Sequence, residues 1–498
     1  MALRTLGILL IALALLIPLT TPATGAGREE WSGPYLLNNT EYRLASLSAA
    51  MVADPYGNAH IFWIESRGRL TNAILYSRYD GRTWTRPLEL FVNEPGQPIA
   101  DFVTASIDHN NRIHLTWLGG AIGPVLTTSA QASQTLSSLE WEEPQRIEVS
   151  AHRFRLFVDS DNKQHLIFTA GYNYQPGVHY VSSTDNWLTM SQPLWLNPEM
   201  PQAFTHDNMQ AYMDAEERIH IVWSEKEIVP QTRGGAIMYL RSVDRGVTWE
   251  PLETIDSSDG EVLLDNSDPS LAVSGDDVHV IWAGGDSLQY RNHRYSADGG
   301  QTWSPVIRRN FGQLHGQAQG DAVVVDAAGQ IHFVGHVRWP EGMYHITWRD
   351  DEWTRPSLFY LNRLGSDDSK AGTINAHGVR AVVRTGNELV VTFYDRADDE
   401  LLLPAYGLYA MSYELSEVSP LSTAPTPTPT LAAAGDDVPA ASTVAPASPT
   451  PTPSWAAETP PSGNGGSPSS LILAGILPAL LIIVAIAFIR ITMRGPLL

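Results

Sequence analysis

Arginine, histidine and aromatic residues gather in short, irregular segments that interrupt a strand-rich sequence. Acidic residues outnumber basic ones by 54 to 32 in this chain, so clustered arginines such as those in His152–Arg155 stand out. An Arg side chain binds a carboxylate through two parallel hydrogen bonds, and Trp or Tyr rings stack on sugars. These residue types predict a site for an acidic sugar or another anionic ligand. The candidate ligand-binding residues are Arg43, Arg67, Arg153, Arg155, His206, His315, His336, Arg338, Trp339, His377, Asp395 and Arg396.

A repeated strand–turn–strand unit must position these residues. It appears first as Ala53–Trp63 and contains a His and often a Trp. It returns at residues 108–117, 159–168, 214–223, 274–282 and 326–334, and more loosely at 384–393. The shared His falls at positions 60, 114, 165, 220, 279 and 332, a period of 51 to 59 residues. Two further short strands follow each unit, and four strands per repeat of this length are typical of propeller blades. We expect the shared His residues to form structural hydrogen bonds to neighbouring turns, since one His per blade cannot converge on a metal.

A second motif, S-x-D-x-G-x-T-W, joins the third and fourth strands of two repeats. The Asp can accept backbone N–H bonds within its own turn, and the Gly permits the positive φ that a tight turn requires. The Trp then re-enters a strand and buries its ring. The two full copies consist of Ser242, Asp244, Gly246, Thr248 and Trp249, and of Ser296, Asp298, Gly300, Thr302 and Trp303. Partial copies occur at residues 77–84, 183–187 and 349–353.

This motif resembles the Asp-box, or bacterial neuraminidase (BNR) repeat, of sialidase-like β-propellers. The surrounding repeat covers nearly all of the chain between Trp31 and Leu415. The predicted fold is therefore all-β, a propeller of seven four-stranded blades, with the six blades that the sialidase resemblance implies as the alternative. Glu30–Asn38 resembles Glu352–Phe359, so an N-terminal strand is predicted to complete the last blade and close the ring.

The resemblance also implies where a ligand binds and what chemistry a sialidase would perform. The Asp-box lies on the face away from the active site, so the candidate residues are expected before the first strand and after the second strand of each repeat. Sialidases hold the substrate carboxylate with three Arg and use a Tyr nucleophile helped by a Glu, with an Asp acid/base. The residues of suitable type are Tyr394, Glu65, Glu225, Asp207 and Asp268. The family's F-R-I-P segment is absent, so these catalytic roles are not assigned.

The ends of the chain predict a membrane protein. Residues 1–26 have a charged start, an apolar core and a small-residue end, as in a secretory signal peptide. Residues 27–415 form the predicted propeller, and residues 416–470 a disordered stalk rich in Pro, Thr, Ala and Ser. The apolar run 471–489 is long enough to span a bilayer, and the basic tail 490–498 is predicted to be cytoplasmic. The expected location is the cell surface, as a single-pass type I protein.

Composition narrows the choice of function. The net charge of −22 argues against nucleic acid, and the absence of Cys excludes disulfides and thiolate metal sites. No metal or cofactor is expected, because the acidic turn 159–162 departs from the spacing of a calcium loop. The favoured function is binding of an extracellular glycan or protein. The alternatives are an exo-glycosidase of sialidase type acting on terminal acidic sugars and a structural surface scaffold. The sequence does not determine the oligomeric state.

Overall fold

The computed structural model describes fourteen stretches of the chain. They are residues 30–38, 44–68, 71–93, 100–120, 123–170, 174–198, 204–227, 235–257, 265–285, 290–311, 321–338, 341–361, 377–396 and 406–425. All of them lie in one compact unit, Met1–Thr428. The predicted signal peptide, the membrane span and residues 426–470 of the predicted stalk fall outside these residues. In the part that is described, no helix is long and apolar enough to cross a membrane.

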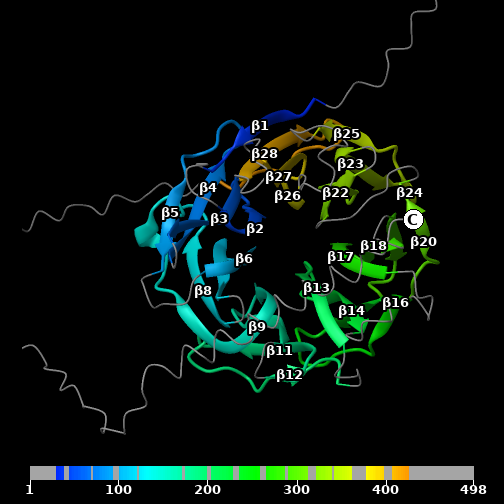
Figure 1. Ribbon diagram of the computed structural model, residues 1–498, viewed down its shortest axis with the longest axis horizontal. Helices are drawn as coiled ribbons and strands as arrows, with labels where there is room; N and C mark the ends of the chain where they lie inside the picture. Colours follow the sequence, from blue (N-terminus) through cyan, green and yellow to red (C-terminus); the bar gives the residue numbers. More distant parts are fainter. Residues whose placement is uncertain are drawn as a thin grey trace, which may run out of the picture. The chain divides into compact units, whose positions relative to one another are not determined.

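The described residues are almost entirely β-structure, as predicted, and all of their strand pairings are antiparallel. The one helical element among them is a single 3-10 turn, Ser138–Glu140. The strands are arranged in a ring in Figure 1.

Four of the sheets each contain the strands of one repeat in chain order, one of them with a branch. The first sheet consists of β2 (Leu44–Ala53), β3 (Ala59–Gly68), β4 (Thr71–Tyr79) and β5 (Leu88–Val92). The next consists of β13 (Phe204–Met213), β14 (Ile219–Glu227), β15 (Gly235–Ser242) and β16 (Glu253–Ser257). It is followed by β17 (Asp265–Ser274), β18 (Asp277–Gly285), β19 (Tyr290–Ser296) and β20 (Ile307–Asn310). The last of the four contains β21 (Ala322–Val325), β22 (Ile331–Arg338), β23 (Glu341–Arg349), β24 (Glu352–Trp353) and β25 (Ser357–Tyr360), with both β24 and β25 paired to β23.

A larger sheet contains one strand that takes part in two repeats. Its members are β6 (Ala100–Ile107), β7 (Arg112–Gly119), β8 (Gly123–Gln131), β9 (Gln145–Val158), β10 (Gln164–Ala170), β11 (Val178–Ser183) and β12 (Leu194–Trp195). The 14-residue strand β9 pairs with β8 through its first half and with β10 through its second half. It therefore serves as the outer strand of one repeat and the inner strand of the next.

The sixth sheet joins the two ends of the folded chain. Its order is β1-β28-β27-β26, and β1 pairs with β28 as the sequence predicted. The members are β1 (Ser32–Leu36), β26 (His377–Arg384), β27 (Glu388–Arg396) and β28 (Tyr406–Glu414). Trp31, just before β1, stacks on Phe359 of the neighbouring sheet with 4.0 Å between ring centroids. This N-terminal strand thus leaves β28 without an open edge.

Five of the six repeated His residues form the hydrogen bond to a preceding turn that the sequence predicted, at positions 60, 114, 165, 220 and 332, whereas His279 bonds to His293. His60 Nε2 lies 3.0 Å from Asp54 Oδ2 in the preceding turn, and its Nδ1 lies 2.8 Å from the Tyr76 hydroxyl on the third strand. Asp54 Oδ1 also accepts the backbone N–H of Asn58. All three side chains of this network are fully or almost fully buried. The same network recurs as Asp159, His165 and Tyr180 and as Asp214, His220 and Tyr239.

Residues 416–425, which the sequence assigns to the stalk, hydrogen-bond to the β-sheet unit. Leu421 N donates to Thr385 O, and Ala424 N donates to Pro55 O, both over 2.8 Å. Val418 is buried. The packed part of the chain therefore continues past residue 415, because this segment runs along the turns that join the first two strands of neighbouring sheets.

Candidate functional site

The site lies along the innermost strands, where the pairing register is interrupted. In β13, β17 and β26 the register with the second strand shifts between Asp207 and Gln210, Ser267 and Ser270, and His377 and Arg380. Each shift contains one residue in the left-handed region, with φ of 52° at Asn208, 50° at Asp268 and 64° at Gly378. Such a bulge bends the strand and redirects the side chains that follow it.

Three arginines on two inner strands form the centre of the site: Arg153 and Arg155 on β9, and Arg380 on β26. Each donates Nη1 to the carbonyl of the residue before it, at 2.9, 2.8 and 2.7 Å respectively. Arg155 Nη2 also donates to Gln210 Oε1 of β13 at 2.6 Å, and Arg380 Nε donates to Ala49 O of β2 at 2.8 Å. These bonds to neighbouring sheets hold the guanidinium groups in position.

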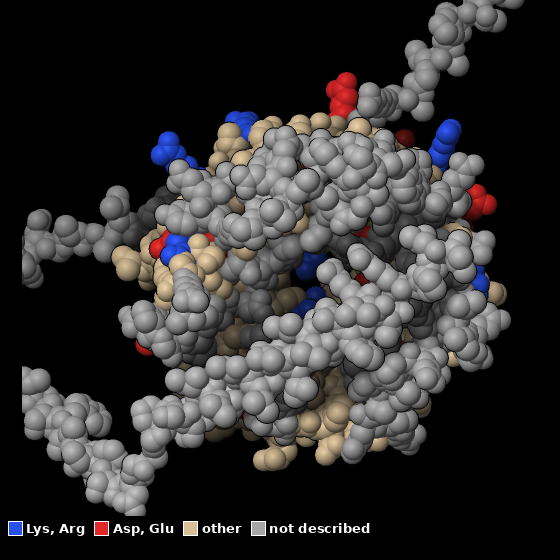
Figure 2. Space-filling model, in the orientation of Figure 1, with Lys and Arg blue, Asp and Glu red and all other residues tan. Residues whose placement is uncertain are grey.

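The three guanidinium groups influence one another electrostatically. Burial, followed by the charges of Arg380 and Arg153, lowers the pKa of Arg155 to about 9. Burial and Arg153 likewise lower the pKa of Arg380. Among the described residues, no carboxylate pairs with any of the three. Figure 2 shows basic side chains within the central opening of the face it presents. This positive charge is therefore not neutralised by the described part of an acidic protein.

An aromatic ring accompanies the arginines. Phe102 of β6 is partly exposed, and the guanidinium carbons of Arg153 and Arg155 lie 4.9 and 5.7 Å from its ring centroid. A guanidinium over a ring face is held by the ring quadrupole. The described cluster thus combines cationic forks, an amide from Gln210 and an apolar ring, which suits a ligand with both a carboxylate and apolar faces.

Tyr394, the candidate nucleophile, lies next to this cluster but is not exposed to it. Its side chain is fully buried in the hydrophobic core with Ile61, Trp63 and Leu408. Burial raises the pKa of Tyr394, and the nearby charge of Arg380 only partly opposes this effect. The phenolate that a nucleophile requires is therefore disfavoured, and a ligand cannot reach the hydroxyl in this conformation.

Glu65 and Glu225 occupy equivalent positions and make the same structural contact. Each is buried, and each accepts a 2.8 Å hydrogen bond from the indole of the Trp two residues before it, Trp63 and Trp223. Burial raises the pKa of Glu225 despite hydrogen bonds from Trp223 and Asn197. Because the same contact recurs in two repeats, it indicates that these carboxylates have a structural role and not a catalytic one.

Other predicted site residues pair with structural partners away from the arginine cluster. Arg67 Nη1 lies 2.6 Å from Glu65, and its Nε lies 3.0 Å from Glu89, so its charge is balanced. Asp395 is buried and accepts a 2.6 Å hydrogen bond from the Tyr360 hydroxyl. The backbone carbonyl of His336 accepts a hydrogen bond from Arg291, which the sequence did not single out.

Several candidates lie within strands, although the sequence placed them in loops. The inner strands begin earlier than predicted, and the second strands end later, because their polar ends still form ladder hydrogen bonds. The correction applies to Glu65, Arg67, Arg153, Arg155, His206, Asp207, Glu225, Asp268, His336, Arg338, His377, Tyr394, Asp395 and Arg396. The side chains of His206, Asp207, Arg338, His377 and Arg396 are not described, and Arg43, His315 and Trp339 lie outside the described residues.

The opposite face carries the Asp-box turns, which form as predicted. Asp298 Oδ1 accepts the backbone N–H groups of Gln301 and Thr302 at 2.9 and 2.8 Å. Ser296 Oγ accepts the Gly300 N–H at 2.8 Å. Hydrogen bonds from the Thr302 side chain and backbone lower the pKa of Asp298. These contacts complete the turn within a few residues, so they serve the scaffold.

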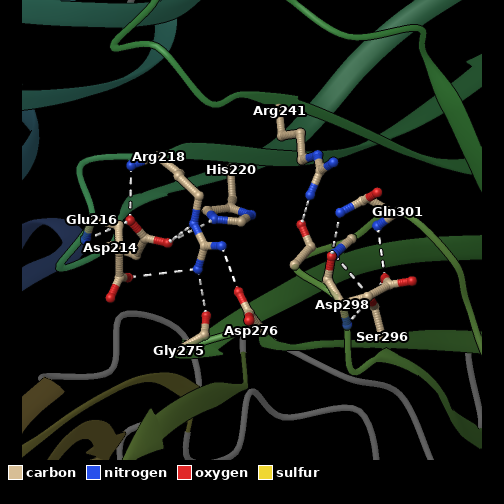
Figure 3. Close-up of polar contacts among 12 residues, drawn as sticks. Asp214, Glu216, Arg218, His220, Arg241, Gly275, Asp276, Ser296, Asp298 and Gln301 are labelled. Carbon is tan, nitrogen blue, oxygen red and sulfur yellow. Dashed lines mark hydrogen bonds and ion pairs between the residues drawn. The ribbon is translucent and has the colours of Figure 1, made fainter.

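Polar contacts join neighbouring repeats on this face (Figure 3). Arg218 pairs with Asp214 of its own turn at 2.6 Å and with Asp276 of the next sheet at 2.6 Å. Arg241 donates to the carbonyl of Gly299 in the following Asp-box turn. Within the described part of the chain, no group of three or more His, Asp or Glu could hold a metal ion.

Sequence reasoning missed Arg380, Phe102 and Gln210. Arg380 lies three residues after the predicted His377, inside a strand that was expected to be structural throughout. Its position relative to the shared His unit matches that of Arg155: each lies four residues before the first turn of its repeat, at Asp159 and Arg384. An alignment of the inner strands would have paired them.

Comparisons with known proteins support the repeat and the fold. The model of the BNR/Asp-box repeat matches residues 294–305, while no curated protein matches the chain in sequence. The solved structure of the polysaccharide lyase Uly1 is similar, with a TM-score of 0.51 at 12% identity over 79% of this chain and 94% of that one. An α-L-arabinanase of Penicillium chrysogenum gives a TM-score of 0.42 at 12% identity, covering 78% and 100%.

A sialidase mutant of Trypanosoma rangeli with trans-sialidase activity gives a TM-score of 0.38 at 13% identity, and the match covers 78% of this chain and 57% of that one. The chain thus spans little more than half of that structure. Identities this low bear on the fold alone. The resemblance to Asp-box β-propellers of the sialidase-like type is accordingly supported by the BNR repeat and by an all-β, propeller-type fold.

Proposed function

We propose that this protein is a cell-surface propeller that binds acidic glycans through the arginines of its central opening. The observation that carries the proposal is the group of Arg153, Arg155 and Arg380, whose charges act on one another without a described carboxylate partner. A fold keeps such an arrangement at a cost in stability, and functional sites are where that cost is usually found. A carboxylate-bearing sugar would relieve the repulsion by bidentate hydrogen bonds.

Binding without turnover is the favoured form of this function. Tyr394 is fully buried, and Glu65 and Glu225 each hold a Trp indole. The alternative is an exo-glycosidase of sialidase type, which is favoured by the closeness of Tyr394 to Arg380. Asp268, on an inner-strand bulge, is a candidate carboxylate for this alternative. A purely structural surface scaffold is the third possibility.

The proposed propeller has seven blades. In support, the innermost strands β2, β6, β9, β13, β17, β21 and β26 each contact the next, and β26 contacts β2 again. The dual pairing of β9 explains why these seven repeats form only six hydrogen-bonded sheets. The sequence of the chain ends supports a type I protein, with the signal peptide 1–26, the stalk and the span 471–489 placing the propeller outside the cell.

The test uses the full-length chain in detergent, on a glycan array and in a fluorogenic sialoside hydrolysis assay. Binding of acidic but not neutral glycans, abolished in Arg380→Gln, supports the proposal. Turnover that disappears in Tyr394→Phe would establish the glycosidase instead. Observation of neither glycan binding nor sialoside hydrolysis would leave the structural scaffold as the better explanation.

A further inference from the structure

A cavity of about 470 Å³ lies where the ring of sheets closes, and none of the three central arginines lines it. One wall is formed by β23 and the segment Thr354–Ser357, and the other by Tyr413 and Leu415–Val418. His332 and His345 also line it, and both are buried. We call it the closure cavity. Figure 1 shows β28 and β1 beside β23 and β25 at this joint.

The closure cavity exists because this joint lacks a turn that other joints have. In two joints, an Asp-box glycine packs so tightly on a third-strand Tyr that an added Cβ would lie 2.5 Å from the Tyr180 hydroxyl at Gly246, or 2.3 Å from that of Tyr239 at Gly300. His345 takes the place of these Tyr residues, because it contacts the shared His of its repeat in the same way. The strands opposite it, β28 and β1, come from different parts of the chain, so no Asp-box turn joins them.

The walls of the cavity are rich in hydrogen-bond donors. Arg349 and Arg355 bring two guanidinium groups to one wall, together with the hydroxyl of Ser357. Asp326, which also lines the cavity, is already engaged by His332 Nε2 at 3.1 Å and by the backbone N–H of Gln330 at 2.9 Å. The volume lies within the range of small-molecule sites, about 300 to 1,000 Å³. Such a lining favours an acceptor-rich, anionic ligand.

A carboxylate of the protein itself already uses one of these donors. Arg349 Nη1 lies 2.7 Å from Glu417 Oε2, which reaches across from the opposite wall. The two side chains are 46% and 75% exposed, so the pair is readily replaced. Glu417 therefore occupies the position of a ligand oxyanion and shows that the Arg349 fork can receive one at this place.

We propose that the closure cavity is a second binding site, for a small molecule that carries an oxyanion such as a carboxylate or a phosphate. The oxyanion replaces Glu417 on Arg349 and gains Arg355 as a second partner. The rest of the molecule lies against Ser357 and the rings of Tyr413 and His345. This site is separate from the arginine cluster of the proposed function and does not depend on it.

Isothermal titration of the full-length chain tests the proposal, with inorganic phosphate and glucuronate as probes and glucose as the uncharged control. The substitutions are made in an Arg155→Met parent, in which binding at the central arginine cluster is weakened, and the wild type is titrated alongside. We expect one of the two anions to bind and glucose not to bind. Arg349→Gln and Arg355→Gln should each weaken binding at least about tenfold, as expected for loss of a charged hydrogen-bond partner. Glu417→Gln should tighten it about two- to fivefold, because it removes the internal competitor.

The two anions distinguish a phosphate source from a carboxylate source. Absence of binding by both, up to about 10 mM, would overturn the inference, because even a weak site fills at that concentration. Binding that is present in the wild type but lost in the Arg155→Met parent would assign the ligand to the central arginines and also overturn it. An unchanged or weaker affinity in Glu417→Gln would refute the competition. The three substituted side chains are exposed, so each variant should keep the unfolding midpoint of the parent.

Discussion

Replacing Arg155 by Met should increase the stability of the protein while it weakens binding of acidic glycans. Arg155 is partly buried beside two other guanidinium groups, with no described carboxylate partner. Burial and these like charges lower its pKa from 12.5 to about 9. At pH 7 the group is charged in both the folded and the unfolded chain, so the folded chain carries the charge at a cost. Met has a similar length and no charge.

The size of the effect follows from the pKa and the hydrogen bonds. Since one pKa unit corresponds to about 1.4 kcal/mol, the charged guanidinium costs the fold at most about 5 kcal/mol. The substitution removes the hydrogen bonds from Arg155 to the Phe154 carbonyl and to Gln210, each of which stabilises the fold by about 1 to 1.5 kcal/mol. Water in the central opening reduces the cost of the charge further. We therefore expect a net gain of about 1 to 2 kcal/mol, or a rise of roughly 1 to 3 °C in Tm for a domain of this size.

The assay is thermal unfolding of the full-length chain at pH 7, followed by tryptophan fluorescence, beside titration with an acidic glycan found on the array. Affinity should fall about 10- to 100-fold. The matched control is Arg146→Met on the same strand, whose side chain is 54% exposed and pairs with Glu148; it should change neither stability nor affinity. A loss of about 3 kcal/mol or more in Arg155→Met would refute the reasoning, because that is the cost of leaving a buried partner charge unpaired.

Three further predictions concern the scaffold. Gly300→Ala should destabilise the fold by about 2 to 4 kcal/mol, because its φ is +91° and the new Cβ would lie 2.3 Å from the Tyr239 hydroxyl. The measurement is a denaturant titration. The control is Gly275→Ala, which has a positive φ but open space around it and should lose less stability. Asp298→Ala should lower the unfolding free energy by about 1 kcal/mol, as for other side chains that cap backbone N–H groups, and an unchanged midpoint would contradict this. Burial lowers the pKa of His220 below 6.5, so its contribution is fully present above pH 6.5 and is lost as the pH falls, by about 1.4 kcal/mol per pH unit; urea titrations between pH 7.5 and 5, with His220→Gln as the control of shallower slope, measure it.

The sequence determined the scaffold to a large extent, because its turns depend on chemistry within a few residues. In the box around Asp298, carboxylate, hydroxyl and glycine meet inside one turn, so the spacing alone predicts the hydrogen bonds that form. The shared His lies six residues after the Asp that it contacts in each complete network, which is also a local relation. The closing role of β1 could be predicted because the last repeat lacks a fourth strand and the N-terminal segment has the sequence pattern of one.

The sequence predicted which types of residue form the candidate site, but only some of the residues themselves. Arg153 and Arg155 were singled out because arginine is conspicuous in an acidic chain. Glu65, Glu225 and Tyr394 were singled out because their residue types match those that a sialidase uses. Each is nevertheless buried among structural partners. Residue type does not reveal burial when strands extend further into polar segments than their apolar pattern indicates.

Tertiary structure alone brought Arg155 and Arg380 together. They are 225 residues apart in the sequence, and only the closure of the ring places β9 and β26 around one opening. It also decided which arginines stay without a described carboxylate and which, like Arg67, are neutralised. The closure cavity likewise arises from the junction of the two ends of the folded chain. What the sequence by itself determined is thus what neighbouring residues do to one another, whereas the charge balance of the site depends on distances that only the closed ring of strands sets.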